Sequence, residues 1–424
     1  MKIKFENNLQ FAKQLDKADN LRGFRSKFSI PRKNGKNSIY FSGNSLGLAP
    51  RLARRFVNQE ITDWTLKAVE GHHHALRPWL YYHKFSRKVL AEIVGAKPSE
   101  VIAMNSLTVN LHLMMVSFYR PTRQRYKIIV EAGAFSSDQY AVETQIKFHG
   151  LNPKDTLIEL APREGEFTLR TPDIIQAIEK AGSSLALIIF GGVQYYTGQF
   201  FDIKSITEAG HKAGAYVAFD LAHAAGNVDL HLHKQNVDFA VWCSYKYLNS
   251  GPGGIAGLFV HEKHFGKPEM PRFAGWWGHD EKERFQMKKG FKSQPGADGW
   301  QLSNVPIFQA AAHLASLEIF EQAGMKALRK KSILLTGFLE FLLKEIDPGG
   351  NHFSIITPSS PEERGCQLSI MIHRDGNRVY TSLIKKGVSV DWREPGVIRL
   401  APVPLYNTFE DVYNFAVILK KILR

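Results

Sequence analysis

Short apolar runs that alternate with amphipathic segments constrain the fold of this chain more than any other feature. The runs lie in the middle of the chain and predict strands at 128–131, 156–160, 185–190, 216–220 and 237–243. The segments between most of them predict helices at 136–149, 171–182 and 203–213. Apolar strands separated by helices are typical of a parallel sheet buried on both faces. Such a sheet binds ligands beyond the carboxyl ends of its strands, so the residues at those ends are the first candidates for a site.

The sequence on either side of this region has a different pattern. Residues 6–22 predict a helix with Phe11, Leu15 and Ala18 on one face, and a short strand is expected at 39–41. Further helical patterns lie at 51–69 and 79–94. Beyond residue 310 the pattern predicts helices at 311–321, 325–343, 377–386 and 409–423, with strands at 367–373, 388–391 and 397–401. This last region reads as an α+β unit with its own small core.

A chain of 424 residues is too long for one simple core. We therefore predict an α/β protein in three parts. Residues 1–45 form an N-terminal segment that packs with the small domain, and residues 46–310 form a large domain around a central, mostly parallel sheet. Residues 311–424 form a smaller α+β C-terminal domain.

Composition and charge exclude several classes of protein. Apolar residues make up 44% and charged residues 22% of the chain, which is ordinary for a folded protein. The net charge of +15 is spread along the chain without the clustered basic stripes and interleaved aromatics of a nucleic-acid-binding surface, so we expect a basic, solvated surface. There are only two cysteines, and we find no apolar leader and no membrane-length apolar run. We expect a cytoplasmic protein that binds neither nucleic acid nor membranes.

No metal site is expected. The histidines at 72–74 and the HEKH string at 261–264 lack the spacing of known zinc motifs, and HEKH is one residue short of HExxH. GPGGIAG is not followed by a helix, which weighs against a dinucleotide site, and no phosphate-binding GxxxxGK[ST] string is present.

Two charged residues close neighbouring strands of the predicted sheet. Asp220 ends the apolar run AYVAFD, and a buried carboxylate is costly unless it is paired, for example with a pyridinium nitrogen. Lys246 ends the next run, VDFAVWCSYK, and a lysine in an apolar setting can form an imine with a carbonyl. Taken singly, Asp220 is as well explained as the cap of a helix over LAHAA, and Lys246 as a surface residue. Together, about 26 residues apart with a helix between them, they have the spacing of a pyridoxal-phosphate (PLP) site.

A PLP site also needs a place for the phosphate and an apolar cover for the ring. Ser106 or Thr108, at the start of the apolar helix 109–118, would offer a hydroxyl and free N–H groups to a phosphate, although plain helix capping has the same geometry. Phe135, after the strand 128–131, is placed to stack on the ring, although core packing is the simpler explanation. Tyr245, beside Lys246, is a candidate to bind the phosphate or transfer a proton.

Several long strings, in order from about residue 20 to the C-terminus, resemble the kynureninase family. They are GNSLGLAP, NSLTVNLHLMMVSFYRPT, GGVQYYTGQ, FDLAHAAGNV, DFAVWCSYKYLN, GPGGIAG, GWWGH, LSNVPI and RLAPVPLYNTFEDVY. The resemblance implies the fold-type I architecture of PLP enzymes and a homodimer with shared active sites. It also implies hydrolysis of L-kynurenine to anthranilate and L-alanine, or of 3-hydroxykynurenine to 3-hydroxyanthranilate and L-alanine, in tryptophan catabolism or NAD biosynthesis.

The resemblance also implies roles for single residues. Lys246 would bind PLP covalently, Asp220 would pair with the ring nitrogen, and Tyr245 would join them as a catalytic residue. The other implied cofactor contacts are Leu107, Thr108, Phe135, Ser136, Ser137, Asp138, Gly191, His223 and, from the partner subunit, Trp276 and Asn304. The implied substrate contacts are Ser45, His72 and Asn304 at the aryl ketone end and Arg399 at the carboxylate. Gly191 stands where some relatives have serine, which removes one hydrogen bond to the phosphate.

The nearest alternative is another fold-type I enzyme. An aminotransferase would need a keto acid, and a cysteine desulfurase would need a cysteine on a mobile loop. Cys243 lies inside a predicted strand, whereas Cys366 begins the predicted strand 367–373 and is the residue to check. A scaffold without activity is disfavoured because Asp220, Lys246 and Arg399 are all present.

Overall fold

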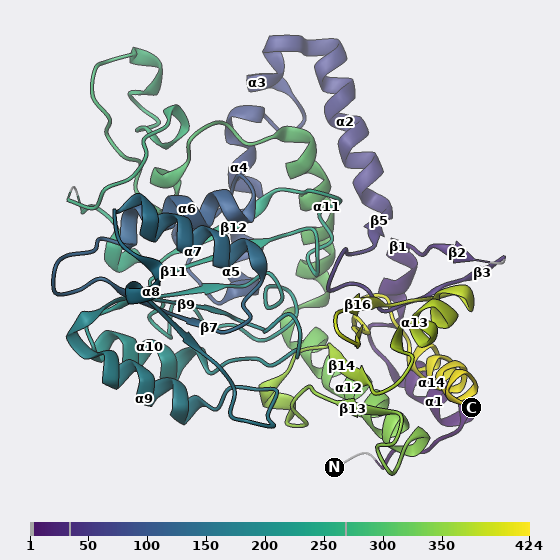
Figure 1. Cartoon of the computed structure of the whole chain (residues 1–424). Helices are drawn as coiled ribbons and strands as arrows, with labels where there is room; N and C mark the ends of the chain where they lie inside the picture. Colours follow the sequence, from purple (N-terminus) through teal and green to yellow (C-terminus); the bar gives the residue numbers. More distant parts are fainter. Residues whose placement is uncertain (1–3, 34, 268) are drawn as a thin grey trace.

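A seven-stranded sheet forms the centre of the molecule (Figure 1). The structure, a computed structural model, describes residues 4–33, 35–267 and 269–424. In spatial order the strands are β6 (Val101–Ala103), β12 (Ala256–Val260), β11 (Phe239–Cys243), β10 (Tyr216–Asp220), β9 (Leu185–Gly191), β7 (Lys127–Glu131) and β8 (Leu157–Leu160). Only β12 runs antiparallel to its neighbours. The expected mostly parallel sheet is therefore confirmed.

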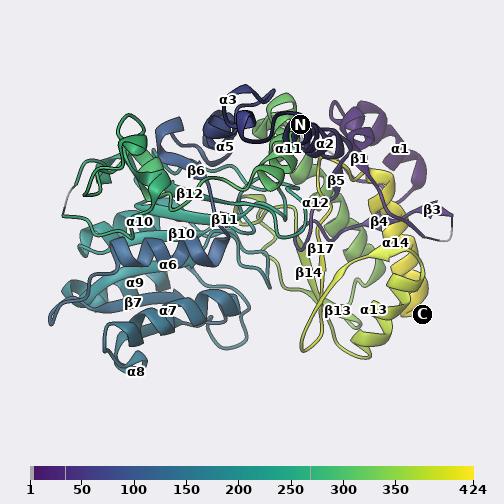
Figure 2. The same cartoon turned by 90° about the horizontal axis from the view of Figure 1, so that it is seen from above.

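Helices cover both faces of this sheet (Figure 2). One face packs against α6 (Leu107–Phe118) and α7 (Ser136–Phe148). The other packs against α9 (Thr171–Ala181), α10 (Ile203–Lys212) and α5 (Arg87–Val94). Side chains alternate between the two cores along each strand, as in β10, where Ala218 faces one core and Val217 and Phe219 face the other. Because both faces are covered, the central strands are apolar apart from charged residues at their ends, such as Glu131 and Asp220.

A second, antiparallel sheet lies in the C-terminal part of the chain. Its order is β13 (Phe353–Ile355), β14 (Leu368–Ile372), β17 (Val397–Leu400) and β16 (Asp391–Arg393). It shares a core with α12 (Met325–Ile346), α13 (Gly376–Lys385) and α14 (Phe409–Leu423). The strand β13 was not anticipated from the sequence, since only Phe353 of its three residues is fully buried and the apolar signal is weak.

The N-terminal segment contacts this second unit. Helix α1 (Leu9–Ala18) packs on α14, and β4 (Ile39–Tyr40) pairs in parallel with β15 (Val388–Ser389). The expected helix over 6–22 is shorter than predicted, because the chain leaves the helix at Asp19 and continues as the 3₁₀ turn η1 (Arg22–Lys27). Of the three residues expected on its buried face, Phe11 and Leu15 are half-buried and Ala18 is exposed, while the fully buried residue of the helix is Ala12.

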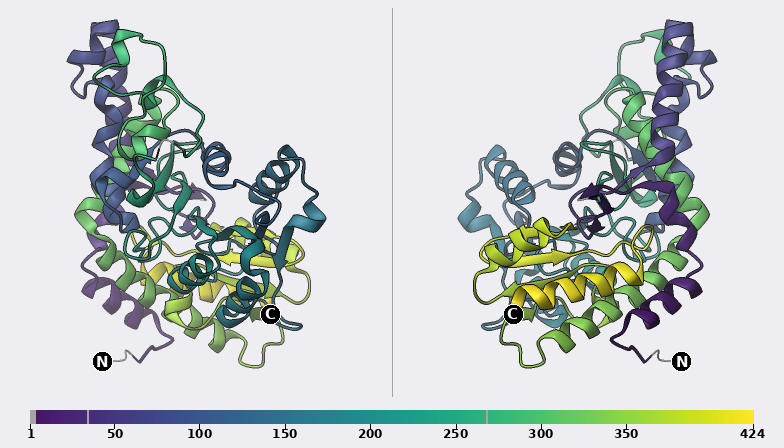
Figure 3. Two further views of the ribbon diagram at one scale, coloured as in Figure 1. Left: turned by 90° about the vertical axis from the view of Figure 1, so that its left-hand side faces the viewer. Right: turned by 90° about the vertical axis from the view of Figure 1, so that its right-hand side faces the viewer.

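Two long helices carry an extension away from the sheet (Figure 3). Helix α2 (Arg51–Lys67) runs beside α11 (Ile307–Ala323), and α3 (Gly71–His74) lies at its tip, at the top of Figure 1. The helix expected at 79–94 is divided into η3 (Trp79–Tyr81), α4 (Tyr82–Phe85) and α5. No helix in the described part of the chain is long and apolar enough to cross a membrane.

The remaining elements are short. Two small hairpin-like pairs are β1 (Phe28–Ser29) with β5 (Ala49–Pro50) and β2 (Arg32–Lys33) with β3 (Lys36–Asn37). The single-turn helices are η2 (Ala68–Glu70), η4 (Pro98–Glu100), α8 (Pro153–Thr156), η5 (Gly182–Ser184), η6 (Glu262–His264), η7 (Trp276–Gly278), η8 (Arg284–Gln286), η9 (Gly296–Trp300) and η10 (Pro361–Glu363).

Candidate active site

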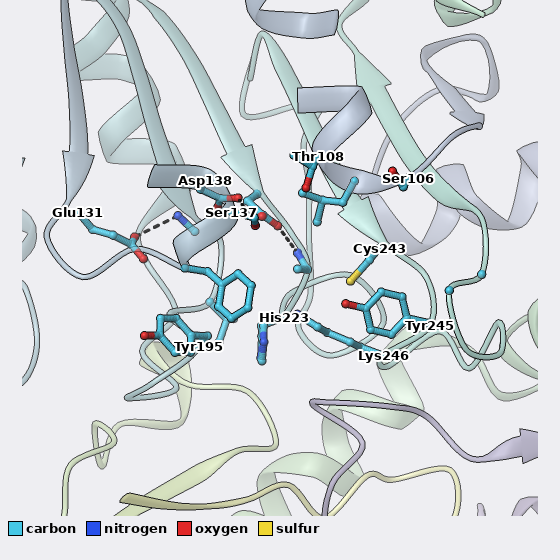
Figure 4. Close-up of a pocket in the computed structure, with 18 residues that line it drawn as sticks. Ser106, Thr108, Glu131, Ser137, Asp138, Tyr195, His223, Cys243, Tyr245 and Lys246 are labelled. Carbon is cyan, nitrogen blue, oxygen red and sulfur yellow. Dashed lines mark hydrogen bonds between the residues drawn. The ribbon is translucent and has the colours of Figure 1, made fainter. Parts of the chain in front are cut away.

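A cavity of about 280 Å³ lies at the carboxyl ends of the parallel strands (Figure 4). Residues that end or follow β7, β9, β10 and β11 meet there, together with the first turns of α6 and α7. The lining residues are Ser106, Leu107, Thr108, Glu131, Phe135, Ser137, Asp138, Gly191, Val193, Tyr195, Asp220, Ala222, His223, Cys243, Tyr245, Lys246, Gly253 and Gly254. The sheet therefore gathers the residues where a parallel sheet is expected to bind a ligand.

Lys246 projects into this cavity from the turn after β11. Its side chain is buried, with 9% exposure, and its Nζ lies 5.5 Å from the ring centroid of Phe135 and 5.9 Å from that of Tyr245. Among the residues that the structure describes, none forms a hydrogen bond or ion pair with this amine. A buried amine without a charged partner is unusual unless it is used chemically.

Asp220 closes the strand next to that of Lys246, as the sequence predicted, since β10 and β11 pair in parallel with Asp220 opposite Val241. The helix expected between the two residues is absent, because residues 222–227 and 232–236 form turns. The Asp220 Oδ1 accepts a hydrogen bond from the Ala222 N–H at 2.7 Å, so the carboxylate caps a turn and not a helix.

Three carboxyl groups are buried together beneath the cavity. Asp138, at the start of α7, shares a hydrogen bond with Asp220, and Glu131 at the end of β7 accepts one from the Gly191 N–H at 3.0 Å. Burial raises the pKa of Glu131 to about 7, and burial also raises the pKa values of Asp138 and Asp220. Because desolvation disfavours three adjacent negative charges, the group holds protons at neutral pH and would be stabilised by a cation.

The opposite wall of the cavity offers hydrogen-bond donors. Helix α6 begins after Ser106, whose side chain forms no capping hydrogen bond within the described chain. The first intrahelical bond is donated by the Asn110 N–H to the Ser106 carbonyl, so the N–H groups of residues 107–109 remain unpaired by the helix. With the helix dipole and the hydroxyl of Thr108, they form an anion-binding end.

An aromatic side chain and an imidazole line the space between the buried carboxyl groups and the first turn of α6. Phe135 is half-exposed and meets Tyr195 edge-on, with ring centroids 5.2 Å apart. His223 is buried, and its Nδ1 has no hydrogen-bond partner in the described residues. Burial lowers the pKa of His223 well below its ordinary value, and the charges of Lys246 and Arg399 lower it further. The imidazole is therefore neutral.

Tyr245 and Cys243 stand beside Lys246 (Figure 4). The two side chains are within hydrogen-bonding reach of each other, and burial raises the pKa of both the phenol and the thiol. Tyr245 is therefore a proton donor that keeps its proton at neutral pH.

Arg399 lies behind Tyr195 and does not line the cavity directly. It is on β17 with 1% exposure, its Nη1 donates to the Tyr195 carbonyl at 2.8 Å, and its Nη2 donates to Ser45 Oγ at 3.3 Å. The structure thus brings Ser45 and Arg399 together, although the family resemblance places Ser45 at the aryl ketone end of the substrate and Arg399 at its carboxylate.

Other predicted residues lie away from this cavity. His72 is in α3 at the tip of the extension, where its ring meets Trp79 edge-on, and half-exposed Trp276 donates a hydrogen bond to the Arg284 carbonyl. Asn304 lines an adjoining cavity of about 300 Å³ that shares Ser106 and Gly253 with the first. Ser136 is exposed at the start of α7 and does not line the cavity, unlike Ser137.

Sequence reasoning missed several lining residues, namely Glu131, Val193, Tyr195, Ala222, Gly253 and Gly254. Glu131 carries the same signal that identified Asp220, a carboxylate that closes an apolar strand. Tyr195 follows β9 by four residues and had no comparable signal, because loop conformation decides which way such a side chain points.

The two cysteines do not behave as mobile nucleophiles. Cys366 is fully buried in a bend before β14, and burial raises the pKa of its thiol to about 12. Cys243 is the last residue of β11. Neither position matches the loop cysteine that a desulfurase would need.

A histidine cluster outside the cavity has its ligand atoms already engaged. Glu100, His233 and His261 place ligand atoms within 4.8 Å of one another. However, His233 Nδ1 contacts Glu100 at 3.0 Å, and His261 Nδ1 accepts a hydrogen bond from the Lys263 N–H at 3.1 Å. The two imidazole rings are stacked nearly parallel, so their in-plane lone pairs do not converge on one point. The cluster ties η4 to η6 and carries no metal site in our interpretation.

Comparisons with known proteins give one family. Residues 328–419 match the model of the kynureninase C-terminal domain. A kynureninase from Flavobacterium psychrophilum is 57% identical over 98% of this chain and 98% of its own length. The Homo sapiens kynureninase is 50% identical over 97% of this chain and 92% of its own.

Solved structures with a similar fold are much more distant in sequence. A cysteine desulfurase from Thermococcus onnurineus has a TM-score of 0.75 at 19% identity, covering 95% of this chain and 98% of its own. A C-DES variant with glycine covalently linked to its PLP cofactor has a TM-score of 0.75 at 16% identity, covering 90% and 96%. These likenesses establish the fold-type I architecture of PLP enzymes for this chain.

Proposed function

Because the chain belongs to the kynureninase family, we propose that it hydrolyses the Cβ–Cγ bond of kynurenine or 3-hydroxykynurenine in the cavity around Lys246. It is a PLP-dependent hydrolase that acts on a carbon–carbon bond next to a ketone. The products are anthranilate, or its 3-hydroxy form, and L-alanine. One observation carries the choice of site: the buried amine of Lys246, which has no hydrogen-bond or ion-pair partner among the described residues, faces a cavity that Asp220 also lines.

The residues of the cavity fit PLP in three respects. The buried acids Asp220 and Asp138 suit a protonated ring nitrogen, which would supply the cation that the carboxyl cluster lacks. The first turn of α6, with Leu107 and Thr108, suits a phosphate, and Tyr245 stands nearby. The orphaned Nδ1 of buried His223 is a polar atom that awaits a partner.

We assign the remaining contacts by position in the cavity. Phe135 covers one face of the ring, and Ser137 and the backbone of Gly191 complete the wall near Asp138. Ser136, for which the resemblance also implies a contact, is exposed and does not line the cavity. When bound, PLP withdraws electrons from the carbon atoms next to the substrate nitrogen.

Lys246 and Tyr245 move the protons of the reaction. The Lys246 amine takes the proton from the substrate Cα and later returns a proton during the release of alanine. Tyr245, which keeps its proton at neutral pH, donates to the oxygen of the γ-carbonyl as water adds to that carbon. Tyr245 recovers its proton from the added water, and the Cβ–Cγ bond then breaks as one hydroxyl of the hydrated carbon gives up its proton. Cβ takes up a proton in its place, and the carboxyl group of anthranilate leaves with the aryl ring.

Arg399 binds the substrate carboxylate, while Ser45, which the family resemblance assigns to the aryl ketone end, contacts Arg399 in this chain. A guanidinium pairs with a carboxylate through two parallel hydrogen bonds, and the Nε–H of Arg399 has no partner within the described chain. Burial lowers the pKa of Arg399, although an arginine keeps its charge at neutral pH. We place the α-carboxylate against this edge, behind Tyr195.

The site is completed by a second copy of the chain. His72, Trp276 and Asn304 do not line the cavity of their own chain, although the family resemblance gives them cofactor or substrate contacts. The extension that carries His72 exposes large apolar side chains, which a partner would cover: Trp64, Leu66, Val69 and Leu76. We propose a homodimer in which His72, Trp276 and Asn304 of the partner subunit reach each cavity.

Subunit mixing tests this sharing. Lys246→Ala and His72→Ala homodimers should each be nearly inactive, whereas random mixing of the two should restore up to about a quarter of wild-type activity, because half of the dimers then hold one intact site of two. If His72 served its own chain, each mixed dimer would lack an intact site and no activity would return. Size-exclusion chromatography of each variant gives the dimer control.

Two further proposals concern the chain as a whole. We divide it into an N-terminal segment (1–45), a large domain (46–310) and a small domain (311–424), with Met1–Ile3, Asn34 and Pro268 outside the described residues. Ser45 and Arg399 then place the substrate carboxylate between the large domain and the other two parts.

We also propose a cytoplasmic location, supported by two buried, unpaired thiols.

The activity itself is tested on purified protein loaded with PLP. L-kynurenine or 3-hydroxykynurenine is added, and the fluorescence of the anthranilate product is followed together with alanine. Product from either substrate supports the proposal, and the ratio of the two rates gives the preference. No product from either substrate, with normal cofactor absorbance, contradicts it and favours another reaction on the same fold.

A further inference from the structure

Arg399 is held by groups of the protein on two sides. Its Nη1 donates to the Tyr195 carbonyl, and its Nη2 contacts Asp391 Oδ2 at 2.7 Å and Ser45 Oγ at 3.3 Å. Of its three nitrogens, only the buried Nε has no partner within the described chain. Three of the five N–H bonds are engaged, so the guanidinium is fixed in orientation with the Nε–H and one Nη1–H left over.

Asp391 reaches Arg399 from the adjacent strand of the small sheet. Residues 391 and 399 are opposite each other in the antiparallel pair β16–β17, so their side chains share one face of the sheet. Ser45 Oγ also donates a hydrogen bond to Asp391 Oδ2, which closes a triangle of Arg399, Ser45 and Asp391. The triangle joins the N-terminal segment to the strand that carries the arginine.

The second oxygen of Asp391 faces another arginine. Arg393 Nη1 lies 3.1 Å from Asp391 Oδ1, but this oxygen has no geometrically sound hydrogen bond in the described residues. Arg393 is partly exposed, whereas Asp391 and Arg399 are buried. The local group therefore has two positive charges and one negative charge, which leaves one positive charge for a ligand.

Arg399 is also close to the cavity in electrostatic terms. Its charge contributes to the lowered pKa of His223, which lines the cavity, and its guanidinium carbon lies 6.0 Å from the ring centroid of Tyr195, which also lines it. A ligand in the cavity that extends past Tyr195 would therefore contact the Nε–H side of the Arg399 guanidinium.

We propose that Asp391 is a positioning residue that acts through Arg399 and selects substrates with a single carboxylate. It holds Nη2 so that the Nε–H edge faces the incoming carboxylate, and it reduces the local charge to match one anion. The inference rests on the proposed function, in which Arg399 binds the substrate. Without Asp391, Nη1 would keep the Tyr195 carbonyl but Nη2 would keep only the longer hydrogen bond to Ser45 at 3.3 Å, so the guanidinium would be free to turn about the Tyr195 contact.

The test compares Asp391→Asn with wild type in steady-state kinetics on PLP-loaded protein. We expect KM for kynurenine to rise about tenfold with kcat within about twofold, because the interaction is with the bound carboxylate and not with the reacting bond. Inhibition by the decarboxylated analogue of kynurenine should not change. Glu394→Gln, which removes an exposed carboxylate of the same hairpin, is the matched control and should match wild type.

A double-mutant cycle separates this role from a merely structural one. In an Arg399→Gln background, Asp391→Asn should have no further effect on KM, because the residue through which it acts is gone. An equal rise in KM in both backgrounds would overturn the inference. So would a lower KM in the single variant, since Asp391 would then compete with the substrate for Arg399.

Two outcomes remain to be distinguished. If Asp391→Asn does not fold, judged by thermal unfolding and cofactor absorbance, Asp391→Glu is used, and an unchanged KM in that variant would overturn the inference. A wild-type protein that cleaves neither kynurenine would overturn the proposed function and this inference together. An active wild type with an unchanged Asp391→Asn variant would overturn the inference alone.

Discussion

The two ends of the proposed site are built in different ways. At the cofactor end, the side chains lie between residues 106 and 254 and follow four strands of one sheet or start the helices beside it. At the substrate end, Ser45 comes from the N-terminal segment and Arg399 from a different sheet, while His72 lies in a distant extension.

The difference reflects how each end depends on packing. The carboxyl ends of parallel strands lie at the same edge of the sheet, whatever the conformation of the loops between them. Asp220 and Lys246 therefore lie near each other because β10 and β11 are neighbouring strands. Ser45 and Arg399 meet only because β4 pairs with β15 and the two sheets are packed together. We expect the cofactor end to decide whether chemistry occurs and the substrate end to decide which molecule undergoes it.

The largest effect is expected at the cofactor end, from Lys246→Ala. Turnover should fall by at least about a thousandfold, because the variant loses both the covalent attachment and the proton acceptor at Cα. The absorbance of covalently bound cofactor should disappear while the dimer stays folded. Kynurenine cleavage at the wild-type rate would show that the lysine has been assigned wrongly.

At the substrate end, Arg399→Gln should reduce kcat/KM by about 30-fold to a few thousandfold, the cost of removing one partner of a buried, charge-assisted pair. The loss should appear mainly in KM. Cofactor absorbance should be normal, which distinguishes this end from the other. A variant that loses bound PLP instead would break the comparison, because Arg399 would then belong to the cofactor end.

A third experiment addresses the stability of the cofactor end through Glu131. Its pKa is raised from 4.5 to about 7, so the folded state keeps a proton that the unfolded state releases. The stability that this proton gives is complete below the unfolded pKa of 4.5 and is lost as pH rises through about 7, by up to about 3 kcal/mol. Glu131→Gln should therefore gain stability relative to wild type as pH rises over this window.

Denaturant unfolding of the PLP-loaded protein at about pH 5 and about pH 8 measures this change. The control is Glu159→Gln, which removes an exposed carboxyl from the neighbouring strand β8. If the free energy of unfolding of Glu131→Gln changes with pH by the same amount as that of wild type, then the buried carboxyl group does not titrate between these pH values. The raised pKa assigned to Glu131 would then be wrong.

The smallest effect is expected from Cys366→Ala. The thiol is buried, and burial raises its pKa to about 12, so it is not a nucleophile at neutral pH. Activity should stay within about twofold of wild type, apart from a modest loss of stability from the small cavity. Loss of turnover without loss of folding would point to sulfur chemistry and to the desulfurase alternative.

Much of the large domain followed from local patterns. The bounds of the strands 128–131, 185–190 and 216–220 were predicted within one or two residues. A short apolar run between two amphipathic helices is typical of a strand buried on both faces of a sheet. The helix expected between Asp220 and Lys246 was wrong, since tertiary contacts hold LAHAAG in turns despite its helical composition. Tyr195 was missed because its direction depends on a loop.

The sequence by itself determined the sheet, the placement of Asp220 and Lys246 at the ends of neighbouring strands, and the family, because these depend on residue order and on periodicities set by the backbone. Only the tertiary structure decided that Glu131 joins Asp138 and Asp220 under the cavity, and that Asp391 and Ser45 hold Arg399. Those contacts join segments up to about 350 residues apart in sequence. No local pattern encodes the distance between such segments, since it is set by how the two sheets pack.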